Sequence, residues 1–268
     1  MENFTLKAGL EKLGIAYLGN VAHSAKMSAS YHNGTMTYCI YLAPWNISGH
    51  QVCPKGENCH KNCLTYSGHE KIAEFTEGNN NRIMNSRINK TRAFYEDRET
   101  FMQVMVHEIK RYMKRAESLG MEFSVRINGT SDLSPLLFKD TESGKNLLEL
   151  FPNVQFYDYT KVYNRINLMK KYPNYDITFS FDGYNHKECK DFLDNGGKVA
   201  VVFYGDLPKE YKGYKVVDGN GYDMRYLDEN GCIVGLHYHK TAKDYYINKE
   251  TNKREFRVPN TPFVVKAV

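Results

Sequence analysis

The chain has 268 residues, of which 41% are hydrophobic and 25% are charged, and its formal net charge is +5 at pH 7. This is the composition of an ordinary globular protein, and the mild positive charge tolerates an acidic partner without requiring one. The N-terminus has no apolar signal region, and no apolar run reaches the roughly 18 residues that suggest a membrane span. We therefore expect a cytoplasmic protein that has no membrane partner and keeps its cysteines reduced.

The first part of the chain predicts one strand and one or two helices. Residues 1–33 are polar and weakly patterned, so we expect an irregular lead-in there. The stretch TMTYCIYLA at 35–43 is rich in β-branched and aromatic residues, which predicts a strand. A cysteine-rich segment follows it. Over 87–120, apolar residues recur at helical spacing and a glycine ends the pattern, which predicts one or two helices.

Short apolar runs alternate with helical stretches through the rest of the chain. Five further strands are predicted, at 122–128, 154–159, 175–181, 198–204 and 232–238. Helices are predicted near 144–151, 161–171 and 185–195. This alternation predicts a mostly parallel α/β sheet, and a doubly wound open sheet and a partial barrel both fit it. The glycine-rich phosphate loops of the common nucleotide-binding folds are missing from the sequence.

Three cysteines stand close together in the segment after the first strand. Cys53, Cys59 and Cys63 have the spacing Cx5Cx3C, and thiolates favour zinc or an iron–sulfur cluster. Both kinds of site normally take four protein ligands, so three thiolates would leave one iron of a [4Fe–4S] cluster open to bind something else. Three nearby histidines are candidates for a fourth zinc ligand: His50, His60 and His69. The residues alone leave three possibilities open: a cluster, a zinc site and three unligated thiols.

Polar residues follow the second predicted strand. Asn128, Thr130 and Asp132 stand at its end. In parallel α/β folds, ligands gather at the carboxyl ends of strands, so these side chains could hydrogen-bond the ribose or amino group of a ligand. The alternative is a cap for the following helix, which the same residue types favour.

The third and fourth strands end in polar residues too. Asp158, Tyr159 and Lys161 stand where a pocket would open, and successive polar groups there favour a catalytic role over a simple ion pair on the rim. Ser180 and Asp182 end the fourth strand, although turn chemistry alone would explain an Asp-Gly pair.

Two further patterns have simpler explanations beside the functional ones. His237 and His239 share a face of the last strand, as a second metal site needs, but exposed strand polarity explains them equally. The stretch 82–115 is strongly basic, which is usual for a solvated helix face and also fits a phosphate-rich substrate or nucleic acid. The remaining cysteines are isolated and are expected to be small buried residues: Cys39, Cys189 and Cys232.

With these residues assembled, the chain resembles the phage "gene product 88" family. The matching stretches are YLAPWNISGHQVCPKGENCHKNCLTYSG, NSRINKTRAFYEDRETFM, VRINGTSD, VQFYDYTK, ITFS, VAVVF and VGLHY, which span residues 41–238. That family looks like a distant relative of the radical S-adenosylmethionine (SAM) proteins. In those proteins a three-cysteine loop follows the first strand of a partial parallel barrel, and SAM chelates the open iron of the cluster.

The resemblance implies a partial (β/α)6 TIM-like barrel of mostly parallel strands over 34–240, inside a single domain over 1–268 that ends in an extension at 241–268. It implies a [4Fe–4S] cluster on Cys53, Cys59 and Cys63, SAM contacts at Asn128, Thr130, Asp132 and Ser180, and an unknown substrate near Asp158, Tyr159 and Lys161. An electron donor would be a further partner, and the expected location is the host cytoplasm. The alternative is a zinc-stabilised phage protein that binds nucleic acid or a host protein and is not an enzyme.

Overall fold

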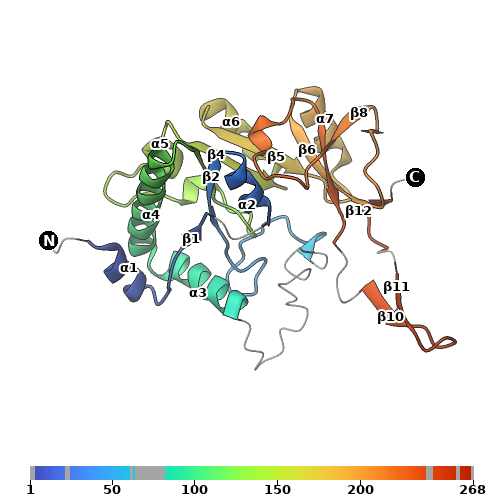
Figure 1. The fold of residues 1–268 in the computed structure, drawn as a ribbon, viewed down its shortest axis with the longest axis horizontal. Helices are drawn as coiled ribbons and strands as arrows, with labels where there is room; N and C mark the ends of the chain where they lie inside the picture. The colour runs from blue at the N-terminus through green and yellow to red at the C-terminus, as the bar shows by residue number, and fades with distance from the viewer. Residues whose placement is uncertain are drawn as a thin grey trace.

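The computed structural model describes residues 4–21, 25–60, 63, 82–239, 244–257 and 260–266. Its centre is a mixed α/β sheet in which most strands run parallel (Figure 1). The parallel strands are β2 (Thr35–Ile40), β3 (Glu122–Arg126), β4 (Gln155–Thr160), β5 (Tyr175–Ser180), β6 (Lys198–Tyr204), β8 (Tyr214–Asp218), β9 (Ile233–His237) and β12 (Val264–Lys266). All six predicted strands are therefore confirmed, with ends that differ by a few residues.

The strands from β2 to β6 are added in one direction. Neighbours run β2, β3, β4, β5 and β6 in chain order, and β9 follows β6 with β8 and β7 (Glu210–Tyr211) on its far side. The order therefore reverses only beyond β6, and the stretch from β2 to β6 has no switch point of the kind found in a doubly wound sheet. Among the described residues the sheet stays open, with β1 (Gly19–Asn20) at one edge and β7 at the other.

The helices connect these strands and cover one face of the sheet. They are α3 (Arg82–Glu96), α4 (Arg98–Ser118), α5 (Leu147–Leu150), α6 (Ile166–Lys171) and α7 (His186–Asp194). Alternate strand residues point to this face, and the main core lies where Tyr38, Val125 and Phe156 pack among α4 side chains such as Phe101 and Met105. A second cluster joins β5, β6 and β9 to α7.

The opposite face of the sheet is polar. Thr37 and Ser124 share a hydrogen bond of 2.8 Å across β2 and β3. Arg126 forms an ion pair of 2.8 Å with Asp223, and the Tyr157 hydroxyl donates to the same carboxylate at 3.1 Å. Because Asp223 comes from the segment before β9, that segment lies over this face and covers it.

The expectation of an irregular lead-in over residues 1–33 is wrong, since it holds α1 (Leu6–Lys12), β1 and α2 (Ala25–His32). The Thr5 side chain caps α1 by accepting from the N–H of Ala8. The short strand β1 depends on a distant partner: the buried Glu108 carboxylate on α4 accepts from the backbone N–H groups of Leu18 and Gly19. A contact with a residue so far along the chain leaves no local pattern in the sequence.

The C-terminal extension also contains regular structure. A hairpin of β10 (Tyr245–Ile247) and β11 (Arg254–Phe256) projects from the body of the protein (Figure 1). After it, β12 joins the main sheet parallel to β6, beyond the point where β5 ends. Gly183 permits this, because its φ is +100° and a Cβ there would lie 2.7 Å from Pro262. Within the described part of the chain, no helix is long and apolar enough to cross a membrane.

Replacing Glu108 by alanine tests the anchor of β1. The change leaves three buried donors without an acceptor, namely the N–H groups of Leu18 and Gly19 and the Tyr38 hydroxyl. We expect the free energy of unfolding in urea to fall by about 3 kcal/mol. Glu117→Ala, at an exposed position on the same helix, is the control and should change it by less than about 0.5 kcal/mol. Equal effects of the two changes would contradict the anchoring role.

Candidate functional site

The three clustered cysteines lie in the loop that leaves the carboxyl end of β2. Cys53, Cys59 and Cys63 are free thiols, and each is partly buried. Burial raises the pKa of Cys53 to about 12; the backbone N–H of Trp45 opposes this shift, and the neighbouring Cys63 and Cys59 act in the same direction as burial. Burial also raises the pKa of Cys59, against which the Lys161 ammonium acts. Cys63 therefore lies close enough to the other two thiols to influence their ionisation. As the described side chains lie, no three His, Cys, Asp or Glu residues are placed to hold one metal ion.

Trp45 shapes this loop. Its φ of 56° lies in the left-handed region. Its backbone N–H donates to the Cys53 sulfur at 3.4 Å, and its backbone carbonyl accepts from the N–H of Val52 at 3.0 Å. The indole stacks on His60 with ring centroids 4.8 Å apart. Gly56 lies directly under the indole, where a Cβ would be 2.7 Å from a ring carbon. Trp45 is the only tryptophan in the chain, so its fluorescence reports on the cysteine loop alone.

The three histidines proposed as zinc ligands differ in their surroundings. The Nδ1 atom of His60 is 2.9 Å from the carbonyl of Glu57, which leaves Nε2 for a metal. His50 stacks on Tyr95 with centroids 4.2 Å apart. His69 lies outside the described residues. Of the two described histidines, only His60 follows a cysteine directly in sequence.

The segment after β3 holds the cysteine loop in place. The N–H of Gly129 donates to the carbonyl of Ile40 at 2.9 Å, and a Cβ on this glycine would lie 2.7 Å from that oxygen. The Thr130 hydroxyl donates to the carbonyl of Leu42 at 2.5 Å, and the Thr130 carbonyl is 4.0 Å from the Cys53 sulfur. Thr130 therefore uses its side chain on the protein itself, next to the first cysteine.

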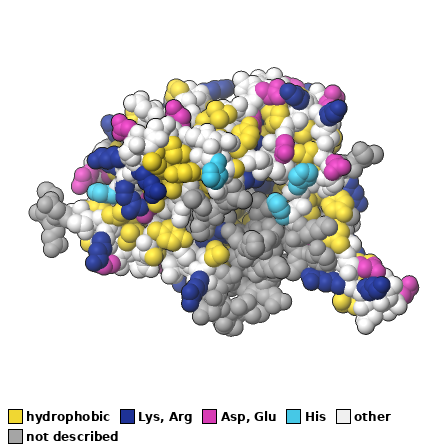
Figure 2. Space-filling view, viewed as in Figure 1, with side chains coloured by type: hydrophobic (Ala, Val, Ile, Leu, Met, Phe, Trp, Pro, Cys, Tyr) yellow, Lys and Arg dark blue, Asp and Glu magenta, His cyan; other side chains and the backbone are white. Residues whose placement is uncertain are grey.

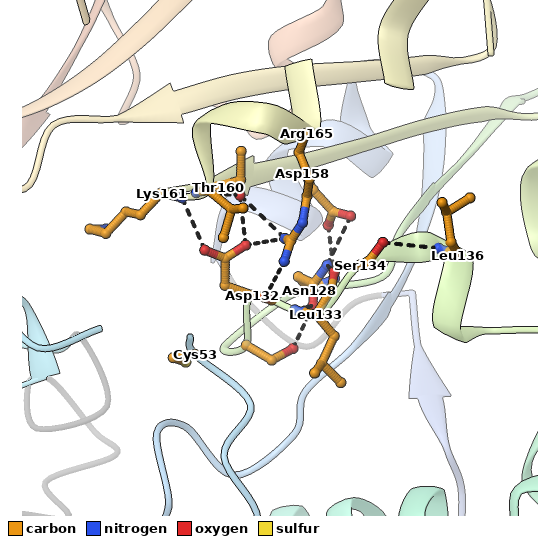
Figure 3. Close-up of polar contacts among 12 residues, drawn as sticks. Cys53, Asn128, Asp132, Leu133, Ser134, Leu136, Asp158, Thr160, Lys161 and Arg165 are labelled. Atoms are coloured by element: carbon orange, nitrogen blue, oxygen red, sulfur yellow. Dashed lines mark hydrogen bonds and ion pairs between the residues drawn. The ribbon is translucent and has the colours of Figure 1, made fainter. Parts of the chain in front are cut away.

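Asp132 joins the three loops that meet at this edge of the sheet. Its carboxylate accepts from the Thr160 hydroxyl at 2.8 Å and from the N–H of Lys161 at 2.9 Å, and it pairs with Arg165 (Figure 3). Its own N–H donates to the carbonyl of Val52, one residue before the first clustered cysteine, at 2.8 Å. Asp132 thus ties the loops after β2, β3 and β4 together.

Arg165 is a residue that reasoning from the sequence missed. It is 7% exposed and binds both the carboxylate and the carbonyl oxygen of Asp132. One signal was present, because Arg165 lies in the predicted helix 161–171 that directly follows a polar strand end. A buried arginine paired with a buried aspartate at neighbouring strand ends would have been a reasonable prediction.

The three residues assigned to catalysis do not lie together. Asp158 is 1% exposed and faces the helix-side core, where it accepts from the N–H and side-chain amide of Asn128 at 2.8 and 3.0 Å. The Tyr159 ring lies on the opposite face, 4.9 Å from the Arg126 guanidinium. Only Lys161 influences the cysteine loop, through Cys59. Asp158 is placed to position Asn128 rather than to touch a ligand.

The remaining predicted site residues lie at the ends of β5 and β9. Ser180 is 8% exposed, and its carbonyl accepts from the Asn185 side chain. Asp182 accepts from Asn58, between the first two clustered cysteines, at 3.4 Å. His237 and His239 are both exposed, and His237 Nδ1 is 3.2 Å from the carbonyl of Gly205. The end of β5 therefore contacts the cysteine loop.

Gly56→Ala tests the packing of the cysteine loop. The added methyl would overlap the indole, so Trp45 must move and the loop must change shape. We expect a shift of the Trp45 emission maximum and a loss of stability of about 1–3 kcal/mol. In Gly221→Ala, where a Cβ meets nothing within 4 Å, the emission should stay unchanged. An unchanged spectrum in Gly56→Ala would contradict this packing.

Asp158 gives the protein a pH-dependent stability. Burial raises the pKa of this carboxyl from 3.8 to about 6, although the Asn128 donors and nearby arginines oppose the shift. Between these two values the folded state binds more protons than the unfolded state. The stabilisation that protonated Asp158 contributes is therefore full below 3.8, the pKa of the unfolded state, and is lost as the pH rises through about 6, the pKa of the folded state.

The Asp158→Asn variant measures this effect, because its side chain cannot ionise. We expect the difference in unfolding free energy, wild type minus variant, to fall by roughly 2–3 kcal/mol between about pH 4 and about pH 7. The substitution also removes one acceptor oxygen, but the effect of that loss on the unfolding free energy is the same at both pH values and cancels between them. A difference that stays the same at both values would show that Asp158 ionises normally.

Comparisons with known proteins agree with the resemblance seen in the sequence. A family model described as Gene product 88 matches residues 10–258, which is most of the chain. No curated protein and no solved structure matches the chain. The cysteine loop, the Asp132 contacts and nearly the whole sheet lie inside the matched range. The chain therefore belongs to the Gene product 88 family of phage proteins.

Proposed function

We propose that this protein is an iron–sulfur protein in which Cys53, Cys59 and Cys63 ligate a [4Fe–4S] cluster, and that it is a radical SAM-like enzyme acting on an unknown substrate. One observation carries the proposal. Three free thiols come from a single loop at the carboxyl end of a parallel sheet, with Cys63 and Cys59 near enough to Cys53 to act on its pKa, and the other three cysteines are buried in β2, in α7 and before β9. Three thiolates with no fourth cysteine suit a cluster that keeps one iron open.

The donor set fits such a cluster. Thiolates are the ligands that iron–sulfur clusters take, and a loop that is partly exposed allows assembly. Burial raises the pKa of Cys53 and Cys59, so cluster binding must displace protons from these thiols. The Lys161 ammonium offsets part of the negative charge that the bound thiolates would bring.

The sheet supports the comparison with radical SAM proteins. The cysteine loop follows β2, and β2 is the first of the parallel strands of the sheet. In the radical SAM proteins a three-cysteine loop has the same place after the first strand of a partial barrel. The spacing Cx5Cx3C differs from the usual CxxxCxxC of that superfamily, so the loop here has its own shape, set by Trp45 and Gly56.

The protein's own residues would position the reacting groups. When bound, the cluster would supply one electron and an open iron for SAM to chelate, and an electron donor would be needed to reduce the cluster. Asp132 and Arg165 fix the backbone at Lys161, which leaves the Lys161 ammonium beside the cysteine loop to hold an anionic group. Asn128, Thr130 and Asp158 would act by holding the loops in register.

A zinc site remains the second candidate, and His60 is the observation that favours it. A histidine that binds metal through Nε2 usually has Nδ1 hydrogen-bonded to a carbonyl or carboxylate, as His60 does with Glu57. Cys53, Cys59, Cys63 and His60 would then form a structural site. The protein would bind nucleic acid or a host protein and would not be an enzyme.

Anaerobic reconstitution with iron and sulfide separates the two candidates. A cluster absorbs near about 400 nm and should quench Trp45 emission by at least about half, whereas Zn²⁺ has a filled d shell and does neither. Cys59→Ser should lose the absorbance and the quenching, and Cys189→Ser, which removes a buried cysteine of α7, should keep both. A visible band that survives in Cys59→Ser would refute the assignment.

A further inference from the structure

The hairpin of β10 and β11 stands away from the body of the protein (Figure 1). It forms a two-stranded sheet of its own, and among the described residues no third strand pairs with either of its edges. At its base, the Phe256 ring stacks on Tyr204 of β6 with ring centroids 5.6 Å apart. Farther out, Tyr246 and Ile247 point to opposite faces, and both are exposed. The outer part of the hairpin is therefore open to a partner on both faces.

The tip of the hairpin has a defined shape. The carbonyl of Asn248 accepts from the N–H of Asn252 at 2.8 Å, and its side chain accepts from the N–H of Glu250 at 2.9 Å. Asn252 has a φ of 52°, in the left-handed region that asparagine tolerates better than most residues. A tip that is already ordered loses little conformational freedom when it binds a partner.

Positive charge is concentrated on this hairpin. Residues 245–257 hold four cations and two carboxylates, so this short segment carries two of the five net positive charges of the chain. Figure 2 shows Lys and Arg side chains on the projecting hairpin, at the lower right of the view. Lys249, Lys253 and Arg257 are exposed, and none of the three forms an ion pair with a described residue. Their charges remain available to an anionic partner.

One of the two carboxylates serves the hairpin itself. Glu255 accepts from the Tyr246 hydroxyl and the Asn248 amide, both at 2.7 Å, and from the Thr251 hydroxyl at 3.2 Å. These donors are neutral groups of the facing strand and the turn. The Arg257 guanidinium lies 4.8 Å from the centroid of the Tyr246 ring. Glu255 thus joins the turn to the strands, and the cations lie around this framework.

The shape of the hairpin favours duplex DNA over an acidic protein surface. The backbones of two paired strands lie about 4.8 Å apart, and the major groove of DNA, about 12 Å wide, admits a two-stranded ribbon. Phosphates border that groove on both sides. Lys249 and Lys253 stand at opposite ends of the turn, and Arg257 lies on the face of Tyr246. Cations spread in this way can meet both phosphate backbones, whereas a protein surface would contact one face.

The basic stretch 82–115 has a different character. Arg87 is 2% exposed and Lys90 is 3% exposed, so the expectation of a solvated helix face is wrong for these two residues. Lys110 and Lys114 of α4 are exposed, but they lie on a helix that packs against the sheet rather than on a projecting element. They offer a matched control for the lysines of the hairpin.

We propose that the hairpin is an interface for double-stranded DNA, with β10 and β11 in the major groove and Lys249, Lys253 and Arg257 on phosphates. Ile247, which is 58% exposed, would then meet base edges, where an apolar side chain can contact the methyl group of thymine. The interface is independent of the cysteine loop and of the function proposed for it.

Fluorescence anisotropy of a labelled DNA duplex, two helical turns long, tests this interface with the full chain at several salt concentrations. For three phosphate contacts we expect a slope of log affinity against log salt of about −3. Lys249→Ala combined with Lys253→Ala should weaken binding roughly tenfold and bring the slope to about −1. Lys110→Ala combined with Lys114→Ala removes the same charge from α4 and should change neither quantity. No binding to the duplex, or equal losses in the two double variants, would overturn the proposal.

An RNA duplex of the same sequence tests the placement in the groove. Its major groove is too narrow for side chains to read, so we expect at least about tenfold weaker binding than to DNA. Equal binding of the two duplexes, or tighter binding of a single DNA strand, would overturn the placement in the major groove.

A second measurement uses wild type alone, in case a variant fails to fold. Acetylation by acetic anhydride is followed at each lysine by mass spectrometry, with and without the DNA duplex. We expect at least about threefold slower modification of Lys249 and Lys253 with DNA, because a phosphate contact shields the amine, and no change at Lys110 and Lys114. Equal rates at Lys249 and Lys253 with and without DNA would overturn the proposal.

Discussion

The Asp132 carboxylate is the interaction on which the candidate site depends. It pairs with Arg165, accepts from Thr160 and Lys161, and its backbone N–H holds the cysteine loop at Val52. A buried carboxylate needs such partners, because an unpaired charge in this position would cost several kcal/mol. The same contacts that satisfy Asp132 therefore set the distance between the cysteine loop and the strand ends that face it.

The winding of the sheet explains why these loops meet. Parallel strands that pair in chain order bring all their carboxyl ends to one edge and their helices to one face. The other face then needs a different cover, and the segment around Asp223 supplies it through Arg126 and Tyr157. The cysteine loop at the carboxyl edge of the parallel strands is the feature that the radical SAM proposal uses.

The sequence predicted the parts of this structure that leave a local pattern. All six predicted strands exist, since their apolar runs alternate with helices in the ordinary way. The sequence-based prediction failed where contacts between residues far apart in the chain determine the structure. Glu108 anchors β1, Arg165 pairs with Asp132, and β12 joins the sheet beside β6, far from it in sequence. Asp158 and Tyr159 point to opposite faces of β4, as consecutive strand residues do, so the predicted strand 154–159 already argued against placing both side chains in one pocket.

The proposed cluster requires that Cys53, Cys59 and Cys63 hold iron and sulfide. Metal and sulfide analysis of the full chain, purified without oxygen, measures both. We expect about four iron and about four sulfide per chain, and loss of both when Cys53, Cys59 or Cys63 is changed to serine. About one zinc per chain, with neither iron nor sulfide, would contradict the proposed cluster and would make the loop a structural zinc site.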